Sequence, residues 1–294
     1  MITENNYQTY LRRMTESYDN TTKSLIPFYT AQAVKSLDRP RILDVGIGSG
    51  VVGKGLRAMI PDAEIYGIDM VQDNIDHAPA GIYDHLITGR FEEYAGIPEG
   101  FDAIIFSSVL HEIGSYADMG RFTDVPVRDA LLHAKALLRT GGTAVVREGL
   151  AENDARAEEP VIASLLREED VLALERFYTE RPLSEKEDAE EQPELRRRPQ
   201  KLPGNGAYDC LVPRDILREF LCTWTWGPKS WNREIQERFC YFSAKKWEDL
   251  LAECGFEVIT SIQSSEEYLK YFKKIIRGYE TDSPLVGVLV GKKR

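Results

Sequence analysis

The chain has 294 residues, of which 43% are hydrophobic and 29% are charged, and its formal net charge is −11. This composition predicts a globular protein with a substantial core, and the negative charge disfavours non-specific binding to nucleic acid, whose phosphates it repels. The sequence contains no apolar run of about 18 residues and no apolar segment at its N-terminus, so we predict neither a membrane-spanning helix nor a signal peptide and expect a cytoplasmic protein.

In the first part of the chain, apolar residues at helical spacing give way to a pattern of alternating strands and helices. Apolar residues near helical spacing over 6–37 predict a helical N-terminal cover, which we assign to 1–37. Short apolar runs then predict strands at 41–45, 64–68, 85–88, 102–106 and 143–147, separated by predicted helices at 51–60, 72–79 and 127–138. This alternation is typical of parallel βαβ units.

The alternation of strands and helices stops over 151–242. We predict that this segment is an inserted cap that shapes the substrate site. A helix is predicted at 160–177, and the segment 180–206 is dense in charge and proline, so we predict a mobile loop or lid there. Helices at 243–254 and 265–277 and strands at 256–261 and 285–290 then resume the pattern. Residues 38–150 and 243–294 are therefore predicted to form one α/β domain.

Two features predict a nucleoside cofactor. The run Asp44-Val45-Gly46-Ile47-Gly48-Ser49-Gly50 follows a predicted strand and precedes a predicted helix, where glycines allow a tight turn and close approach of a ligand. Asp69 ends the next predicted strand, where a carboxylate can accept hydrogen bonds from both ribose hydroxyls.

The glycines alone do not identify the cofactor, because Gly48, Gly50 and Gly53 also fit the spacing of a dinucleotide-binding loop. Asp44 favours S-adenosylmethionine, since an acid before the first glycine suits a free ammonium group and repels a pyrophosphate. The four cysteines, Cys210, Cys222, Cys240 and Cys254, form no C-x-x-C pair, and the sequence predicts no zinc or other metal site.

Four segments in order, RILDVGIGSGVVG, IYGIDM, FDAIIFSSVLHEIG and LLRTGGTAVV, resemble the motif set of class I S-adenosylmethionine-dependent methyltransferases. The resemblance covers about residues 40–150 and returns over 243–294. It implies a Rossmann-like, seven-stranded, mostly parallel sheet with helices on both faces. The N-terminal IPFY segment, which includes Tyr29, resembles a helical entry that covers the cofactor in many bacterial members.

The resemblance also implies roles for individual residues. Asp44, Gly46, Gly48 and Gly50 would line the methionine end of the cofactor, and Asp69 would hold its ribose. Further along the chain, Met70 would lie against adenine, Arg90 and Phe91 would flank it, and Ser107 and Ser108 would lie beside the sulfonium. The stretch GRFEEY departs from the family pattern of an acid beside a small residue.

Catalytic and substrate residues are predicted from residue chemistry. His111 follows the fourth predicted strand and titrates near neutral pH, so it could remove a proton from the acceptor, with Glu112 orienting it. Packing beneath the cofactor is the alternative role for His111, because methyl transfer often needs only positioning. Trp224, Trp226 and Trp231 could form an apolar pocket for the acceptor, or the core of the cap. Tyr29 is a further candidate substrate residue.

We therefore predict transfer of a methyl group to oxygen or nitrogen of a small-molecule substrate by direct displacement, without a membrane or nucleic-acid partner. Residues 107–110 lack the (D/N)PP(Y/F) pattern of enzymes that methylate planar amino nitrogens. The alternatives are methylation of tRNA or a protein side chain, and an enzyme that uses the cofactor without methylating, such as a carboxy-S-adenosylmethionine synthase. A non-enzymatic binding module with a degenerate site and an NAD-dependent oxidoreductase are two further alternatives.

Overall fold

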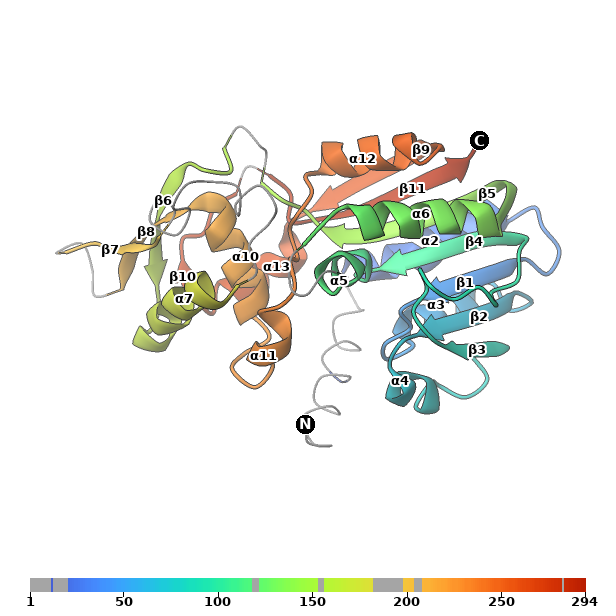
Figure 1. The fold of residues 1–294 in the computed structure, drawn as a ribbon, viewed down its shortest axis with the longest axis horizontal. Coiled ribbons are helices and arrows are strands. Elements are labelled where there is room, and N and C mark those ends of the chain that lie inside the picture. The colour runs from blue at the N-terminus through green and yellow to red at the C-terminus, as the bar shows by residue number, and fades with distance from the viewer. Residues whose placement is uncertain are drawn as a thin grey trace.

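The computed structural model describes residues 12, 21–117, 122–152, 156–181, 198–203, 208–281 and 283–294. These residues form two lobes, each built on its own sheet, as Figure 1 shows. About half of the predicted N-terminal cover over 1–37, and most of the predicted loop over 180–206, lie outside the described residues. Among the described residues, no helix combines the length and the apolar character needed to cross a membrane.

The larger lobe contains a seven-stranded sheet in the order β3-β2-β1-β4-β5-β11-β9. Its strands are β1 (Arg41–Val45), β2 (Glu64–Asp69), β3 (His85–Thr88), β4 (Phe101–Ser107), β5 (Leu138–Gly149), β9 (Phe256–Ser264) and β11 (Val286–Lys293). Only β11 runs antiparallel to its neighbours, β5 and β9. The predicted Rossmann-like fold is confirmed, and the strand order changes direction at β1 and β4, where ligands bind in open α/β sheets.

Helices cover both faces of this sheet, because its central strands are apolar on both sides. Along β4, Ala103 and Ile105 pack on one face with residues of α2 (Leu25–Val34) and α3 (Val51–Met59). Ile104 and Phe106 pack on the opposite face with residues of α6 (Val125–Leu137) and α12 (Ala244–Glu253). The two short helices near the strand ends are α4 (Gln72–Asp76) and α5 (Leu110–Ser115), and η1 (Thr22–Ser24) precedes α2.

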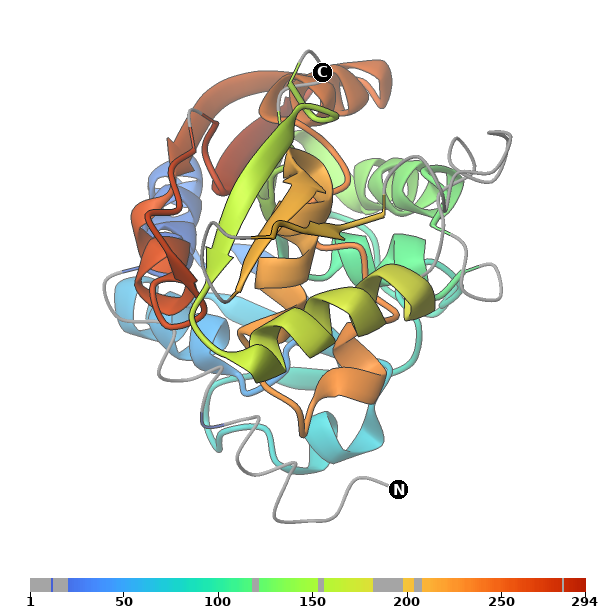
Figure 2. The ribbon, with the colours of Figure 1, turned by 90° about the vertical axis from the view of Figure 1, so that its left-hand side faces the viewer.

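The smaller lobe, called the cap here, has a four-stranded sheet in the order β10-β6-β8-β7. Its elements are β6 (Pro160–Leu165), α7 (Glu168–Glu180), β7 (Gln200–Lys201), β8 (Asp209–Pro213), α10 (Arg214–Trp224), α11 (Trp231–Glu234), α13 (Glu266–Phe272) and β10 (Ile276–Arg277). Figure 2 shows α7 beside the small sheet, seen from the cap side. A separate apolar core holds the cap together, including Phe177, Phe220 and Phe272.

The cap differs from the prediction in three places. The predicted helix over 160–177 is strand β6 followed by α7, since β6 pairs with β8. The predicted helix over 265–277 ends at Phe272, because Ile276–Arg277 pairs with β6. The cap core therefore also includes Phe272, Ile275, Ile276 and Leu285, which we had assigned to the α/β domain.

One buried arginine bonds to two of the chain segments that cross between the lobes. Arg218 of α10 is fully buried, and it donates hydrogen bonds to the carbonyls of Leu150 (2.8 Å) and Pro284 (2.9 Å). It also forms an ion pair with buried Glu152, at 2.6 Å. Because both crossings bond to the same guanidinium, the cap is attached firmly to the larger lobe.

Candidate functional site

A cavity of about 970 Å³ lies between the two lobes, at the carboxyl ends of β1, β2 and β4. The larger lobe lines it with Gly46, Asp69 and Ser107, among others, and the cap lines it with Trp224 and Tyr268, among others. Its volume is at the upper end of the range of about 300–1,000 Å³ for small-molecule sites. The site therefore has two walls that belong to different parts of the fold.

The glycine loop between β1 and α3 forms part of the first wall. Gly46 and Gly48 line the cavity, whereas Gly50 does not. Gly46 has φ of 71°, and a Cβ there would lie 2.7 Å from a methyl group of Val109. A Cβ on Gly50 would lie 2.4 Å from the ring of Pro79, so Gly50 is required for packing of the loop.

Asp69 lies at the end of β2 and is 7% exposed. Its two carboxylate oxygens accept hydrogen bonds from the backbone N–H groups of Gly48 (3.0 Å) and Val71 (2.9 Å). The carboxylate thus lines the cavity in a fixed orientation. Each oxygen retains acceptor capacity for a hydroxyl of a ligand.

Asp44 differs from its predicted role, because it does not line the cavity. It is 1% exposed, and it accepts a hydrogen bond of 2.8 Å from the hydroxyl of Tyr83. Burial raises the pKa of Asp44 to about 7, against the opposing effect of the Tyr83 hydrogen bond. A carboxyl group so placed supports the loop from behind, through its hydrogen bond to Tyr83.

The other predicted cofactor residues all line the cavity: Met70, Arg90, Phe91, Ser107 and Ser108. Phe91 also packs in the core, at 5.4 Å between ring centroids from Phe106. The buried Ser107 hydroxyl has no hydrogen-bond partner among the described residues. Ser108 adopts a left-handed φ of 58°, which is uncommon outside glycine and typical of functional sites.

His111 lies in α5 and is held by Glu148, which is fully buried at the end of β5. One oxygen of Glu148 lies 2.7 Å from Nδ1 of His111, and the other accepts hydrogen bonds from the backbone N–H groups of Val109 and Leu110. Burial alone would lower the pKa of His111, but Glu148 and Glu237 together hold it well above its usual value. These surroundings favour the protonated imidazole, which opposes the predicted role of His111 as a base.

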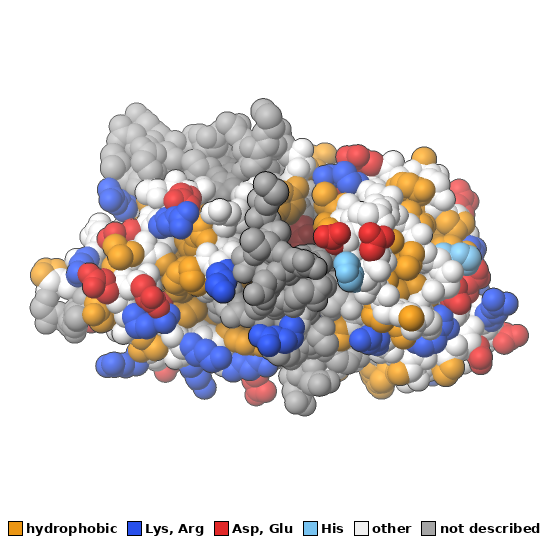
Figure 3. Space-filling model, turned by 90° about the horizontal axis from the view of Figure 1, so that it is seen from below, with side chains coloured by type: hydrophobic (Ala, Val, Ile, Leu, Met, Phe, Trp, Pro, Cys, Tyr) orange, Lys and Arg blue, Asp and Glu red, His pale blue; other side chains and the backbone are white. Residues whose placement is uncertain are grey.

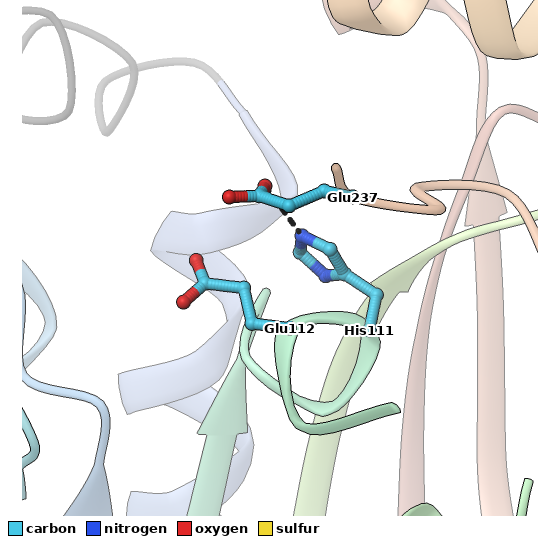
Figure 4. Close-up of side chains that lie close together, drawn as sticks. All are labelled: His111, Glu112 and Glu237. Carbon is cyan, nitrogen blue, oxygen red and sulfur yellow. Dashed lines mark ion pairs between the residues drawn. The ribbon is translucent and has the colours of Figure 1, made fainter. Parts of the chain in front are cut away.

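A group of carboxylates faces His111 across the cavity. Figure 4 shows Glu112, from the same helix, and Glu237, from the loop after α11, beside the imidazole, with an ion pair between Glu237 and His111. Nε2 of His111 lies 3.6 Å from a carboxylate oxygen of Glu237, whose other oxygen accepts a hydrogen bond from the Tyr116 hydroxyl. Burial, reinforced by Glu237, raises the pKa of Glu112 to about 8, and burial likewise raises the pKa of Glu234 to about 8.

The predicted substrate residues divide into two groups. Trp224 and Trp226 line the cavity. Trp231 instead belongs to the cap core at 2% exposure, and its indole N–H donates to Glu180 at 2.8 Å. Tyr29 packs against the core beneath the sheet and does not line the cavity.

Sequence reasoning missed Glu148, Glu237 and the cavity-lining Arg147. Arg147 and Glu148 end a buried apolar strand, and two adjacent charges at that position were a usable signal. Glu237 gave no such signal, because it follows a short helix in the cap. Its contacts with His111 and Tyr116 join segments that are far apart in the sequence.

A family model described as "Methyltransferase domain" matches residues 10–261 of the chain. None of the curated proteins matches the chain significantly in sequence.

Several solved structures are similar to this one. Human N-acetylserotonin methyltransferase, in complex with S-adenosylmethionine, has a TM-score of 0.52 and is 15% identical, covering 99% of this chain and 56% of that chain. The MccD protein has a TM-score of 0.49 and is 9% identical, and the match covers 92% of this chain and 96% of that chain. An S-adenosylmethionine-dependent methyltransferase from Methanosarcina mazei has a TM-score of 0.46 and is 14% identical, and the match covers 87% of this chain and 93% of that chain. At such identity, the similarity to the human protein concerns the fold alone.

Proposed function

Because the chain belongs to the methyltransferase family, within the class I S-adenosylmethionine-dependent superfamily, we propose that it methylates a small molecule held between its two lobes. Its cofactor is S-adenosylmethionine. The observation that carries the proposal is the cavity of about 970 Å³, which has strand ends of the larger lobe on one side and the aromatic side chains of the cap on the other.

The residues of the first wall suit the cofactor. Asp69 would accept hydrogen bonds from the ribose hydroxyls, since its carboxylate is already held by two backbone N–H groups. Met70, which is 54% exposed, would cover the adenine, and the backbone at Gly46 and Gly48 would lie against the methionine part. The hydroxyl of Ser107, which has no partner among the described residues, would bond to the bound cofactor.

The cap wall suits a small acceptor. Trp224 and Trp226 supply apolar surface, and the indole of Trp224 is fixed by a hydrogen bond of 2.8 Å to Asp170. Fixed aromatic side chains bury a flat or apolar acceptor at little cost in conformational entropy. The two walls would bring the acceptor atom and the methyl group together, which is the main requirement of this reaction.

The chemistry is a direct displacement at the methyl carbon of the cofactor, in which an oxygen or nitrogen of the acceptor is the nucleophile. A lone pair of that atom forms a bond to the methyl carbon, the carbon–sulfur bond breaks with its electron pair going to sulfur, and S-adenosylhomocysteine leaves. The acceptor loses a proton, which passes to a carboxylate or to water. His111, whose pKa Glu148 and Glu237 hold well above its usual value, would position the neighbouring carboxylates and is not proposed as the base.

The surface charge also favours a small acceptor. The face drawn in Figure 3 carries Lys and Arg side chains among Asp and Glu side chains on both lobes. With a net charge of −11 for the chain, this mixture offers little attraction for the phosphates of an RNA acceptor.

The test uses S-adenosylmethionine carrying a label in its methyl group. The purified protein is incubated with the small-molecule fraction and, separately, with the macromolecular fraction of a cell extract, with excess S-adenosylhomocysteine as the inhibited control. We expect label in small molecules, matched by formation of S-adenosylhomocysteine.

Two results would contradict the proposal. Label in protein or RNA alone would favour a macromolecular acceptor. Consumption of the cofactor without transfer of label to any acceptor would favour a reaction other than methylation, such as carboxy-S-adenosylmethionine synthesis.

A further inference from the structure

Three side chains of the cavity, those of His111, Glu112 and Glu237, converge on one region. Nε2 of His111 forms an ion pair of 3.6 Å with one carboxylate oxygen of Glu237, so an ion bound there would replace the proton on Nε2. Both side chains are more than nine-tenths buried, and both residues line the cavity. Glu112 lies beside them and also lines the cavity.

We propose that His111, Glu112 and Glu237 bind a divalent transition-metal ion in the wall of the cavity. One ligand atom from each residue lies within 4.8 Å of the others. Two ligands that are each about 2.1 Å from a shared ion lie about 3.0–3.6 Å apart at the usual coordination angles. The separation of 3.6 Å between His111 and Glu237 fits that spacing, and small side-chain movements would bring Glu112 to it.

Groups behind the three residues orient them as ligands. Nδ1 of His111 is held at 2.7 Å by Glu148, which leaves Nε2 directed at the cluster. Metal-binding histidines typically donate their other ring N–H to a carboxylate in this way. The Tyr116 hydroxyl donates a hydrogen bond of 2.8 Å to one oxygen of Glu237 and leaves the other oxygen for the ion.

The ligand set also indicates the kind of ion. Imidazole suits zinc, iron and nickel, whereas carboxylates suit manganese and magnesium, so one histidine with two carboxylates favours Mn²⁺, Fe²⁺ or Zn²⁺ over an all-oxygen site for Mg²⁺. The ion would keep open positions on its cavity side, where water or an oxygen of the acceptor can bind. The proposed ion does not rest on the methyl-transfer proposal, because it can be measured without substrate or cofactor.

Mn²⁺ is the probe, because its paramagnetic resonance distinguishes bound from free ion. The full chain, stripped of metal, is titrated with Mn²⁺, and we expect one bound ion per chain. Modulation of the Mn²⁺ signal by a coordinated nitrogen is expected as well, and it should disappear in His111→Gln.

The variants test the assignment residue by residue. Glu237→Gln and Glu112→Gln should each weaken Mn²⁺ binding at least about tenfold, and Glu148→Gln should weaken it by about 10–100-fold through loss of orientation. Glu234→Gln is the matched control: its carboxylate lines the same cavity and is paired with Arg233, but it is not among the three ligands. This control should change Mn²⁺ affinity less than about threefold. Thermal unfolding and S-adenosylhomocysteine binding verify that each variant is folded.

Three outcomes would overturn the metal site. They are absence of Mn²⁺ and Zn²⁺ binding at millimolar concentration, binding without nitrogen modulation, and a Glu234→Gln effect as large as that of Glu237→Gln. The last would indicate diffuse attraction by an acidic cavity. In each case, normal binding of S-adenosylhomocysteine would leave the proposed methyl transfer standing.

Discussion

The carboxylate of Glu148 lies 2.7 Å from Nδ1 of His111 and ties the end of β5 to the start of α5. The same carboxylate accepts hydrogen bonds from the backbone N–H groups of Val109 and Leu110, at 2.8 and 2.7 Å. One buried side chain therefore satisfies the first turn of α5 and fixes the imidazole that faces the cavity. The position of His111 therefore depends on β5, which carries Glu148.

Replacing Glu148 with glutamine should destabilise the protein. The amide has one acceptor oxygen where the carboxylate has two, so at least one of the three hydrogen bonds is lost, at a cost of about 1–3 kcal/mol. The free energy of unfolding in urea measures this. Glu93→Gln, whose side chain is 69% exposed, is the control and should stay within about 0.5 kcal/mol of the original protein. Equal stability of the Glu148 variant and the original would contradict the assigned role.

Asp69→Asn should weaken the binding of S-adenosylmethionine by about 1–3 kcal/mol, because a charged acceptor for the ribose hydroxyls is lost. Calorimetric titration provides the affinity, and thermal unfolding verifies that the Gly48 and Val71 contacts of Asp69 have not been lost with the fold. Asp73→Asn, at an exposed position of α4 outside the cavity, should leave the affinity unchanged. An unaltered affinity in the Asp69 variant would remove the ribose assignment.

Asp44 should make stability fall as pH rises. Its pKa is about 7 in the folded protein, against the ordinary value of 3.8 expected in the unfolded chain. Between these values the folded state binds more protons than the unfolded state, so this contribution to stability is complete below about pH 4, declines up to about pH 7 and is constant above.

The measurement is the difference in unfolding free energy between the original protein and Asp44→Asn, taken at several pH values. The asparagine can still accept the Tyr83 hydrogen bond but does not titrate. The original protein should lose stability relative to the variant as pH rises through this window. A difference that does not depend on pH would show that Asp44 is ionised throughout.

Glu152→Gln should loosen the attachment of the cap. Arg218 and Glu152 are 0% and 1% exposed, and removing one charge leaves the other buried without compensation, at a cost of about 3–5 kcal/mol. Asp249→Asn breaks the exposed pair with Lys245 and should cost at most about 1 kcal/mol. Urea unfolding gives the free energy of unfolding of both variants. Similar losses of unfolding free energy in the two variants would mean that Arg218 does not hold the crossing segments through this ion pair.

Much of the larger lobe could be predicted because its signals are local. The strand Arg41–Val45 is buried on both faces and forms a short apolar run, and the glycines and Asp69 follow strand ends at the expected places. The strand Pro160–Leu165 could not be predicted in the same way. Its pairing with Asp209–Pro213 is set by a partner distant in the sequence, whereas the spacing of Val161 and Leu165 also fits a helix.

The residues of the candidate site likewise divide into those that local sequence signals predict and those that only distant contacts define. Asp69 and His111 are in strand-end motifs and could be identified from the sequence. Glu237 could not, because 121 residues separate it from Tyr116, to which it is hydrogen-bonded. Asp44 shows the opposite error: its position in the motif suggested a ligand contact, but its carboxylate lies behind the loop against Tyr83.

The measurement that tests the central claim most directly is calorimetric titration of the purified protein with S-adenosylmethionine, S-adenosylhomocysteine and NAD. We predict that both adenosyl compounds bind with a stoichiometry of about one and that NAD does not bind. Binding of NAD alone, or of none of the three, would contradict the assignment of the cavity at Asp69 to this cofactor.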